Sequence, residues 1–276
     1  MAFVSPSQTA ALSRRDRVII SSCLVLLTAL AWMYLFHLDH QMSAAMEHDR
    51  MMADMGMTMD MQWNTADIFF TFAMWAVMMV GMMMASAAPV MLLFAGMQRA
   101  RGAQRTPRVV FAFSAGYLLV WTAFSAGAAL AQWALHQAAM LSPAMTTSSA
   151  RLSSAILIAS GVYQLTPFKG ACLTHCRSPL GFLLGHWRAG WRGAVSMGWA
   201  HALYCLGCCG ALMVVLVVAG AMGLPWVLLI ACVVAAEKIL PRGEWIARMT
   251  GVALALLGVA VAAEPGLAAL LRAWAM

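Results

Sequence analysis

Residues 193–220 have the sequence GAVSMGWAHALYCLGCCGALMVVLVVAG, without a single Asp, Glu, Lys or Arg. About 20 helical residues are enough to cross the ~30 Å hydrocarbon core of a bilayer. A helix also satisfies its own backbone hydrogen bonds in lipid, which an isolated extended segment does not. This stretch therefore predicts a transmembrane helix.

The rest of the chain repeats the pattern. Hydrophobic residues make up 63% of the sequence, charged residues only 10%, and the mean hydropathy is +0.81. A soluble domain carries about 25% charged residues, and no alternating ten-residue pattern of a membrane barrel is present. We therefore predict an all-α polytopic membrane protein, a bundle of about seven transmembrane helices, rather than a soluble enzyme. The expected spans are 18–38, 67–96, 109–136, 150–166, 193–220, 224–240 and 249–263.

The distribution of Lys and Arg predicts the orientation. With a cytoplasmic N-terminus, only Arg50, Arg151 and Arg272 fall on the outer side, as the positive-inside rule requires. We expect a multi-pass protein of the bacterial inner membrane, with the lipid bilayer as its partner. The net charge of +7 then needs no nucleic acid, and no phosphate-binding loop predicts a nucleotide.

This topology divides the chain into three parts. Residues 1–38 form the cytoplasmic N-terminus and first helix, 39–66 a periplasmic loop, and 67–276 a six-helix membrane domain with a cytoplasmic Cys-His-Cys segment. The loop is rich in Met, His and Asp. Thioether sulfur favours Cu(I), and imidazole and carboxylate also accept Cu(II), so the loop is a candidate copper-collecting segment. A flexible acidic linker is the alternative. The candidate ligands are His40, His48, Met55, Met57 and Met59.

Segment 67–96 carries a run of methionines. Met74, Met78 and Met82 recur every fourth residue and so share one helical face. Stacked thioethers can pass a soft ion along the helix. Methionine is also a flexible core filler, so plain packing is the alternative.

The opening segment carries the densest set of metal-binding residue types. Met197, His201, Cys205 and Cys208 follow one helical stripe, with Cys209 at its edge. Polar groups at membrane depth are costly and usually functional. One stripe cannot surround an ion, so we expect a further ligand from segment 67–96 or from the Cys-His-Cys segment.

That segment contains Cys172, His175 and Cys176, which share one face if it is helical. Lys169 and Arg177 flank it, and positive charge favours thiolate over thiol. The alternative is a juxtamembrane turn with two small apolar residues. None of the seven cysteines lies in a predicted outer loop, so we expect reduced thiols.

Two lesser expectations concern the cytoplasmic side. Segment 179–192 alternates apolar with basic residues, a pattern typical of an interfacial amphipathic helix. Glu237 and Lys238 are expected to form a pair at a helix end.

Four blocks carry a family resemblance: MWAVMMVGMM at 74–83 with Pro89, YQLTPFKGACLTHCRSP at 163–179, HALYCLGCC at 201–209, and EK at 237–238. Together they resemble the bacterial family of predicted metal-binding integral membrane proteins, which has no established function. The resemblance covers roughly residues 66–250, and the first helix and its loop lie outside it. Gly210 departs from the family, which often has Trp there. The resemblance implies metal binding at Met, Cys and His positions but gives no reaction; copper is inferred from the softness of the ligands.

These observations predict a Cu(I)-binding membrane protein. It would capture copper at the periplasmic face and hold or relay it, either across the membrane or to a cuproenzyme such as a copper-dependent membrane enzyme or its assembly complex. One alternative is a membrane-embedded metal-dependent oxidoreductase, or a subunit of one. Against this, cysteine-rich closed sites are typical of metal storage and transfer, whereas catalytic sites keep an open position. A metal-free thiol-redox or scaffold subunit is the other alternative.

Overall fold

The computed structural model describes residues 13–55, 63–101, 106–140, 149–220, 223–264 and 266–267. Within these ranges every long element is an α-helix, which confirms the all-α prediction. The elements are α1 (Arg14–Asp54), α2 (Thr65–Ala100), α3 (Thr106–Gln137), α4 (Ala150–Gln164), α5 (Pro167–Arg177), α6 (Pro179–Gly185), α7 (Gly190–Ala219), α8 (Leu224–Ile239) and α9 (Gly243–Ala263).

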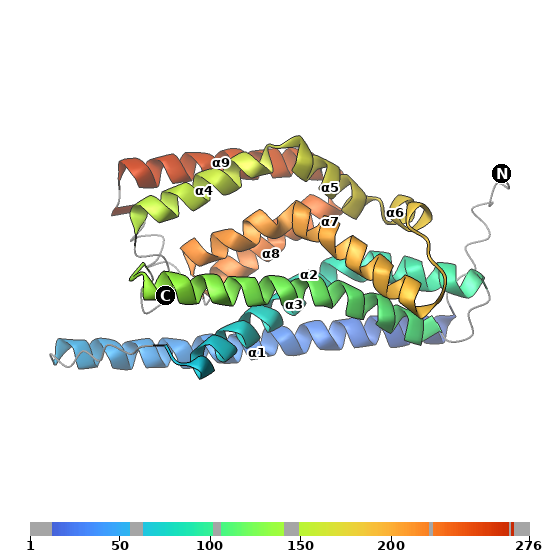
Figure 1. Ribbon diagram of the computed structural model, residues 1–276, viewed down its shortest axis with the longest axis horizontal. Coiled ribbons are helices and arrows are strands. Elements are labelled where there is room, and N and C mark those ends of the chain that lie inside the picture. The colour runs from blue at the N-terminus through green and yellow to red at the C-terminus, as the bar shows by residue number, and fades with distance from the viewer. Residues whose placement is uncertain are drawn as a thin grey trace.

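The long helices run roughly along one direction and form an elongated bundle (Figure 1). Helix α7 occupies its middle and contacts α3, α4, α5 and α8. Helices α4 and α9 pack on each other at one edge, and α1 packs on α2 at the opposite edge. The central helix is therefore the one that carries the predicted cysteine stripe.

Five helices are long and apolar enough to cross a membrane: α2, α3, α7, α9 and the Arg14–Ala44 part of α1. The chain is thus a multi-pass membrane protein. The predicted segments 150–166 and 224–240 are helical, but α4 has 15 residues and α8 has 16, fewer than the ~20 that a perpendicular span needs. Seven crossings and the orientation therefore remain predictions.

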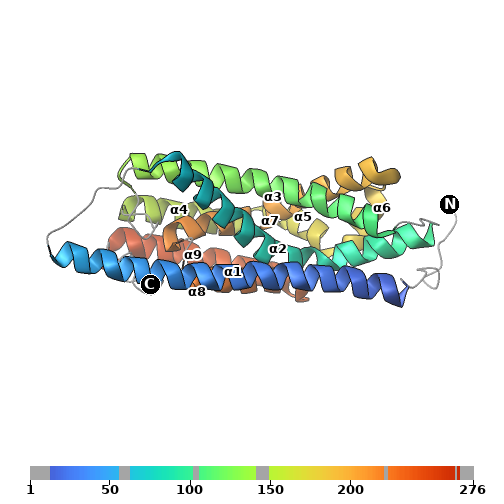
Figure 2. The same ribbon diagram turned by 90° about the horizontal axis from the view of Figure 1, so that it is seen from below.

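The first helix is longer than expected. The segment beyond residue 38, expected as a loop, continues α1 as far as Asp54, and α1 projects past the rest of the bundle at that end (Figure 2). No proline interrupts the segment between Arg14 and Asp54, and methionine and glutamate are good helix formers. Part of the Met/His/Asp-rich segment is therefore an extension of the first span.

Segment 179–192 also differs from its prediction. Instead of one interfacial helix it forms the short α6, which ends at Gly185, and a break before α7. The reason is that Phe182 and Leu183 are buried against the bundle, because their apolar side chains gain more from the core than from the membrane surface.

Helix α2 bends along its length (Figure 2). Pro89 lies inside it, and an internal proline removes one helical hydrogen bond and kinks the helix. The bend lets α2 keep contact with both α1 and α3.

Helices α3 and α7 approach closely at two glycines. A Cβ on Gly116 would clash with the carbonyl oxygen of Val195, and one on Gly198 with that of Phe113. Small residues at such crossings let membrane helices pack backbone to backbone. This contact fixes α7 against α3.

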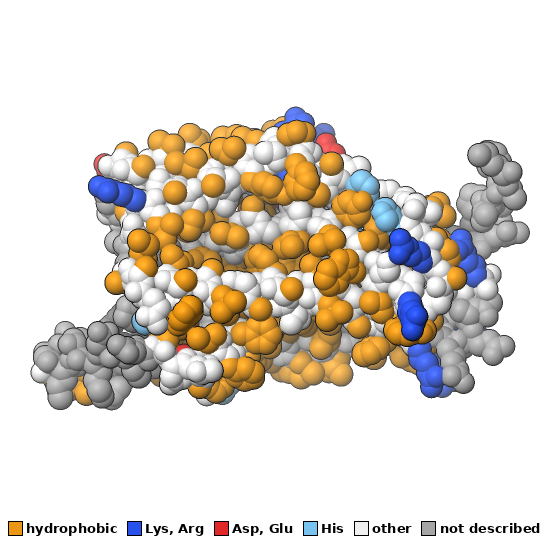
Figure 3. Space-filling model, in the orientation of Figure 1, with side chains coloured by type: hydrophobic (Ala, Val, Ile, Leu, Met, Phe, Trp, Pro, Cys, Tyr) orange, Lys and Arg blue, Asp and Glu red, His pale blue; other side chains and the backbone are white. Residues whose placement is uncertain are grey.

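The visible surface is mostly hydrophobic, and basic side chains gather mainly near one end (Figure 3). At that end, Arg99 at the end of α2 forms an ion pair of 2.8 Å with Asp16 of α1. Arg101 stacks over Trp187, just before α7, at 3.8 Å from the ring centre. The start of α1, the end of α2 and the start of α7 thus meet at one end of the bundle, which we call the basic end.

Candidate metal centre

Three cysteines of α7 form a compact sulfur cluster. The Sγ atoms of Cys205, Cys208 and Cys209 all lie within 4.8 Å of one another, and all three side chains are buried. The thiols of Cys208 and Cys209 donate to the carbonyl oxygen of Cys205 at 3.1 and 2.9 Å, which holds both side chains on the Cys205 side of the helix. We call these three residues the cysteine cluster.

The spacing suits one soft ion. A thiolate bond to a first-row metal is about 2.3 Å, so three sulfurs around one ion lie ~4.0 Å apart. The Cys205 and Cys209 sulfurs are 4.0 Å apart. Small side-chain rotations can therefore bring these sulfurs into trigonal or linear coordination around one ion. Cu(I) suits such a site because it prefers soft ligands.

Helix α5 adds a fourth thiol. Its start is fixed by Thr166, whose side chain accepts a hydrogen bond from the Lys169 amide, and by Pro167 in the first turn, a favoured position for proline. This start directs Cys176 toward α7, where its sulfur lies 3.7 Å from that of Cys208. Cys176 is a half-buried residue, whereas Cys205, Cys208 and Cys209 are buried.

Gly207 lets α5 come this close. A Cβ at Gly207 would lie 2.6 Å from the Cys172 sulfur, and the Tyr163 hydroxyl of α4 donates to the Gly207 carbonyl oxygen at 2.6 Å. Cys172 and Cys176, which were predicted to share one face, therefore have different surroundings. Cys176 joins the cluster, while Cys172 is buried against the Gly207 backbone.

The expectation that Lys169 and Arg177 favour the thiolate forms of Cys172 and Cys176 is wrong. Burial raises the pKa of the Cys172 thiol, and hydrogen bonding to Cys205 and Cys208, together with burial, raises the pKa of Cys176. The reason is that Lys169 is bonded to Glu237 at 2.7 Å, and Arg177 donates to main-chain carbonyls instead.

Helix α2 contributes a thioether. The sulfur of Cys209 lies 3.8 Å from the sulfur of Met83. Met74, Met78 and Met82 are buried on the same helix, but it is Met83, one position beyond the predicted face, that contacts the cluster. Sequence spacing alone could not tell which of these closely spaced methionines contacts the cysteine cluster.

Two polar side chains that the sequence reasoning did not select contact Cys205. The Lys238 ammonium lies 3.1 Å from the Cys205 sulfur and donates to the Ser86 hydroxyl at 3.0 Å. The Tyr117 hydroxyl lies 3.2 Å from the same sulfur. The sequence had marked Lys238 only as a helix-end partner of Glu237 and in the EK block of the family resemblance.

Glu237 and Lys238 do not pair with each other, contrary to expectation. Successive helical residues point in different directions, so Glu237 bonds to Lys169 and Gln164 while Lys238 points to the cluster. The buried Lys169–Glu237 pair joins α5 to α8.

His201 is not among the residues whose ligand atoms lie within 4.8 Å of one another. It is buried, and its ring packs against Phe113, Tyr117 and Phe182 with centroids 5.0–6.3 Å away. Its Nδ1 atom has no hydrogen-bond partner among the described residues. Met197, one turn earlier, is also buried. The structure thus brings the cysteine half of the predicted stripe into the cluster and surrounds the imidazole with aromatic rings.

The remaining predicted ligands lie elsewhere. His175 stacks on Tyr204 at 4.3 Å, and its Nδ1 lies 2.9 Å from the Ala171 carbonyl oxygen. His40 on the extended α1 and Met55 directly after it are exposed. The His48 side chain and residues Met57 and Met59 lie outside the described residues.

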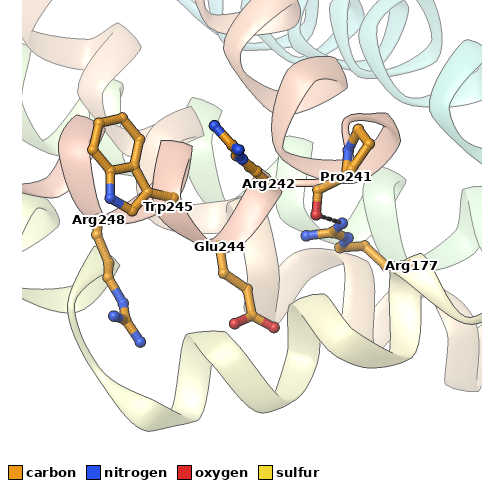
Figure 4. Close-up of a pocket in the computed structure, with 6 residues that line it drawn as sticks. All are labelled: Arg177, Pro241, Arg242, Glu244, Trp245 and Arg248. Atoms are coloured by element: carbon orange, nitrogen blue, oxygen red, sulfur yellow. Dashed lines mark hydrogen bonds between the residues drawn. The ribbon is translucent and has the colours of Figure 1, made fainter.

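A pocket of about 700 Å³ lies between the end of α5, the turn before α9 and the first turns of α9. Figure 4 shows the Arg177 guanidinium bonded to the Pro241 carbonyl, while Glu244 and Arg248 extend in a common direction. Its lining is Arg177, Pro241, Arg242, Glu244, Trp245 and Arg248, without any sulfur. The pocket is therefore separate from the candidate metal centre.

Fold and site together define a helical, multi-pass membrane protein with a buried, sulfur-lined centre that can hold a soft metal ion. The model of the PpoB2 family, described as a copper chaperone, matches residues 72–261. The chain belongs to this copper chaperone family, and the match includes the whole cysteine cluster. The metal inferred from ligand softness and the metal named by the family agree. No curated protein and no solved structure matches the chain.

Proposed function

We propose that the protein receives Cu(I) on the periplasmic side of a bacterial inner membrane, holds it at the cysteine cluster, and donates it to a copper-requiring protein. Copper is the cargo, not a resident cofactor. The observation that carries the proposal is the buried set of three cysteine sulfurs within 4.8 Å of one another in a chain of the copper chaperone family.

The Met/His-rich segment is the proposed entry. Its first part, up to Asp54, is the end of α1 opposite Arg14, which extends beyond the bundle. Its proposed ligands are His40, His48, Met55, Met57 and Met59. Thioethers bind Cu(I) without the risk of oxidation to disulfides that thiols face outside the cytoplasm.

The methionines of α2 form the proposed connection to the centre. Met74, Met78 and Met82 are buried along the helix, and Met83 reaches the cluster. Thiolates bind Cu(I) more strongly than thioethers, so the ion gains stability as it passes from methionine to cysteine.

Cys176 is the proposed outlet. It touches Cys208 but is half-buried, unlike the three cluster cysteines. A copper ion exchanging from Cys208 to Cys176 moves from α7 to α5 and toward the surface. An acceptor with its own thiolates or thioethers can then take the ion by ligand exchange, which needs no change of oxidation state.

The test is Cu(I) binding to the purified full chain in detergent, without oxygen, in competition with bicinchoninate. We expect at least one tightly bound ion, and loss of that ion in the Cys205→Ser/Cys208→Ser double variant. The matched control is Cys23→Ser/Cys232→Ser, which removes the two exposed cysteines and should bind like wild type. A cluster variant that keeps its full copper content contradicts the proposal.

A further inference from the structure

The Lys238 ammonium is the charged group closest to the cysteine cluster in the described part of the chain. It lies 3.1 Å from the Cys205 sulfur, and its other acceptor is the neutral Ser86 hydroxyl. No carboxylate within 4.0 Å pairs with it among the described residues, whereas the nearby Lys169 is neutralised by Glu237. Its positive charge is therefore directed at the sulfurs.

Such a cation is costly where it stands. Even partial burial of an ammonium without a counter-charge is unfavourable, and the half-buried Lys238 is placed between α2 and α7 with Tyr117 beside it at the same sulfur. The cost falls when the cluster carries negative charge. Two thiolates around Cu(I) have a net charge of minus one, which one ammonium balances.

We propose that Lys238 is a specificity-determining residue that makes the centre prefer monovalent copper over divalent ions such as Zn(II). This inference rests on the proposed function of the same site. Lys238 does not bind the metal itself; its charge acts through space on the bound ion.

The physical basis is the difference of one charge between the two ions. An ion bonded to Cys205 lies about 5 Å from the ammonium, given a metal–sulfur bond of ~2.3 Å. At an effective dielectric constant of about 20, one additional unit of charge at that distance lowers affinity on the order of a hundredfold. Attraction of Lys238 to the thiolates helps both ions equally, so it leaves the preference unchanged.

The proposal also explains the Ser86 contact. Ser86 donates to the Met83 carbonyl oxygen at 2.9 Å and accepts from Lys238. It therefore holds the ammonium on the side of α2 that faces the cluster, next to the methionine that contacts Cys209.

The experiment measures the affinity of the full-length protein for Cu(I) by bicinchoninate competition and for Zn(II) by competition with a chromophoric chelator. The quantity of interest is the ratio of the two affinities. We expect Lys238→Met and Lys238→Gln to shift this ratio toward zinc by about tenfold or more. Lys238→Arg, which keeps the charge, should stay close to wild type.

The glutamine variant helps to separate charge from hydrogen bonding, because Gln keeps an N–H donor but is neutral. An unchanged ratio in a neutral variant that elutes as a folded monodisperse protein overturns the proposal, and if one neutral variant does not fold the other decides. A shift as large in the arginine variant also overturns it. If wild type binds no Cu(I), the proposed function fails instead, so the two failures are distinguishable.

Discussion

The sulfur of Cys209 lies 3.8 Å from the sulfur of Met83, which joins the cysteine helix α7 to the methionine helix α2. This contact makes a specific methionine part of the centre. Replacing Met83 by Leu should lower Cu(I) affinity about tenfold, the lower range of losses when a supporting partner of a metal site is removed. Chelator competition measures it.

Met84→Leu is the matched control, since Met84 lies next to Met83 and has no proposed role in copper transfer. Both methionines are buried, and exchange of Met for Leu conserves volume and usually costs under ~1.5 kcal/mol. Equal affinities of the two variants would remove Met83 from the centre.

Cys176 should control release rather than affinity. Because Cys176 is half-buried and its sulfur is 3.7 Å from that of Cys208, Cys176→Ser should retain most bound copper. The rate of copper transfer to an added Cu(I) acceptor should fall on the order of tenfold. Stopped-flow transfer to a coloured Cu(I) chelator gives the rate, with Cys232→Ser as control. A rate equal to that of the control argues for a different outlet.

The Lys169–Glu237 ion pair should matter for stability beside the site. Removing one partner leaves an uncompensated buried charge, so Lys169→Met should cost about 3–5 kcal/mol. The double variant Lys169→Met/Glu237→Leu should recover much of this, because both buried charges are gone. Unfolding in detergent followed by circular dichroism measures both. If the double variant loses as much stability as Lys169→Met and Glu237→Leu lose together, the two charges are not coupled.

The backbone contact between α3 and α7 should tolerate no side chain. Gly198→Ala pushes a Cβ into the Phe113 carbonyl and should destabilise the protein by about 1–3 kcal/mol. Gly127→Ala on α3 meets nothing within 4 Å and should be neutral or stabilise by about 0.5–1 kcal/mol. The unfolding temperatures compare them; a similar fall in both would contradict the close approach.

The sequence predicted what lies along one helix better than what lies between helices. Cys205, Cys208 and Cys209 share a stripe because 3.6 residues complete each turn, and their clustering followed from spacing alone. The same spacing placed His201 beside them, but the aromatic rings of α3 and α6 surround its imidazole. Those neighbours come from the packing of other helices.

The cross-helix partners needed the fold. Tyr117 and Lys238 contact Cys205 from positions 88 and 33 residues away in the chain, a distance that no local pattern reports. Lys238 was expected to pair with Glu237, since adjacent opposite charges near a helix end suggest that. The buried Lys169 takes that glutamate instead.

Copper K-edge X-ray absorption of the Cu(I)-loaded full chain tests the central claim most directly. We predict a copper ion coordinated by sulfur alone, with a spectrum that is lost in Cys205→Ser/Cys208→Ser and unchanged in Cys23→Ser/Cys232→Ser. A spectrum dominated by imidazole scattering, or one that the cluster substitutions leave unchanged, would contradict a copper centre at the cysteine cluster.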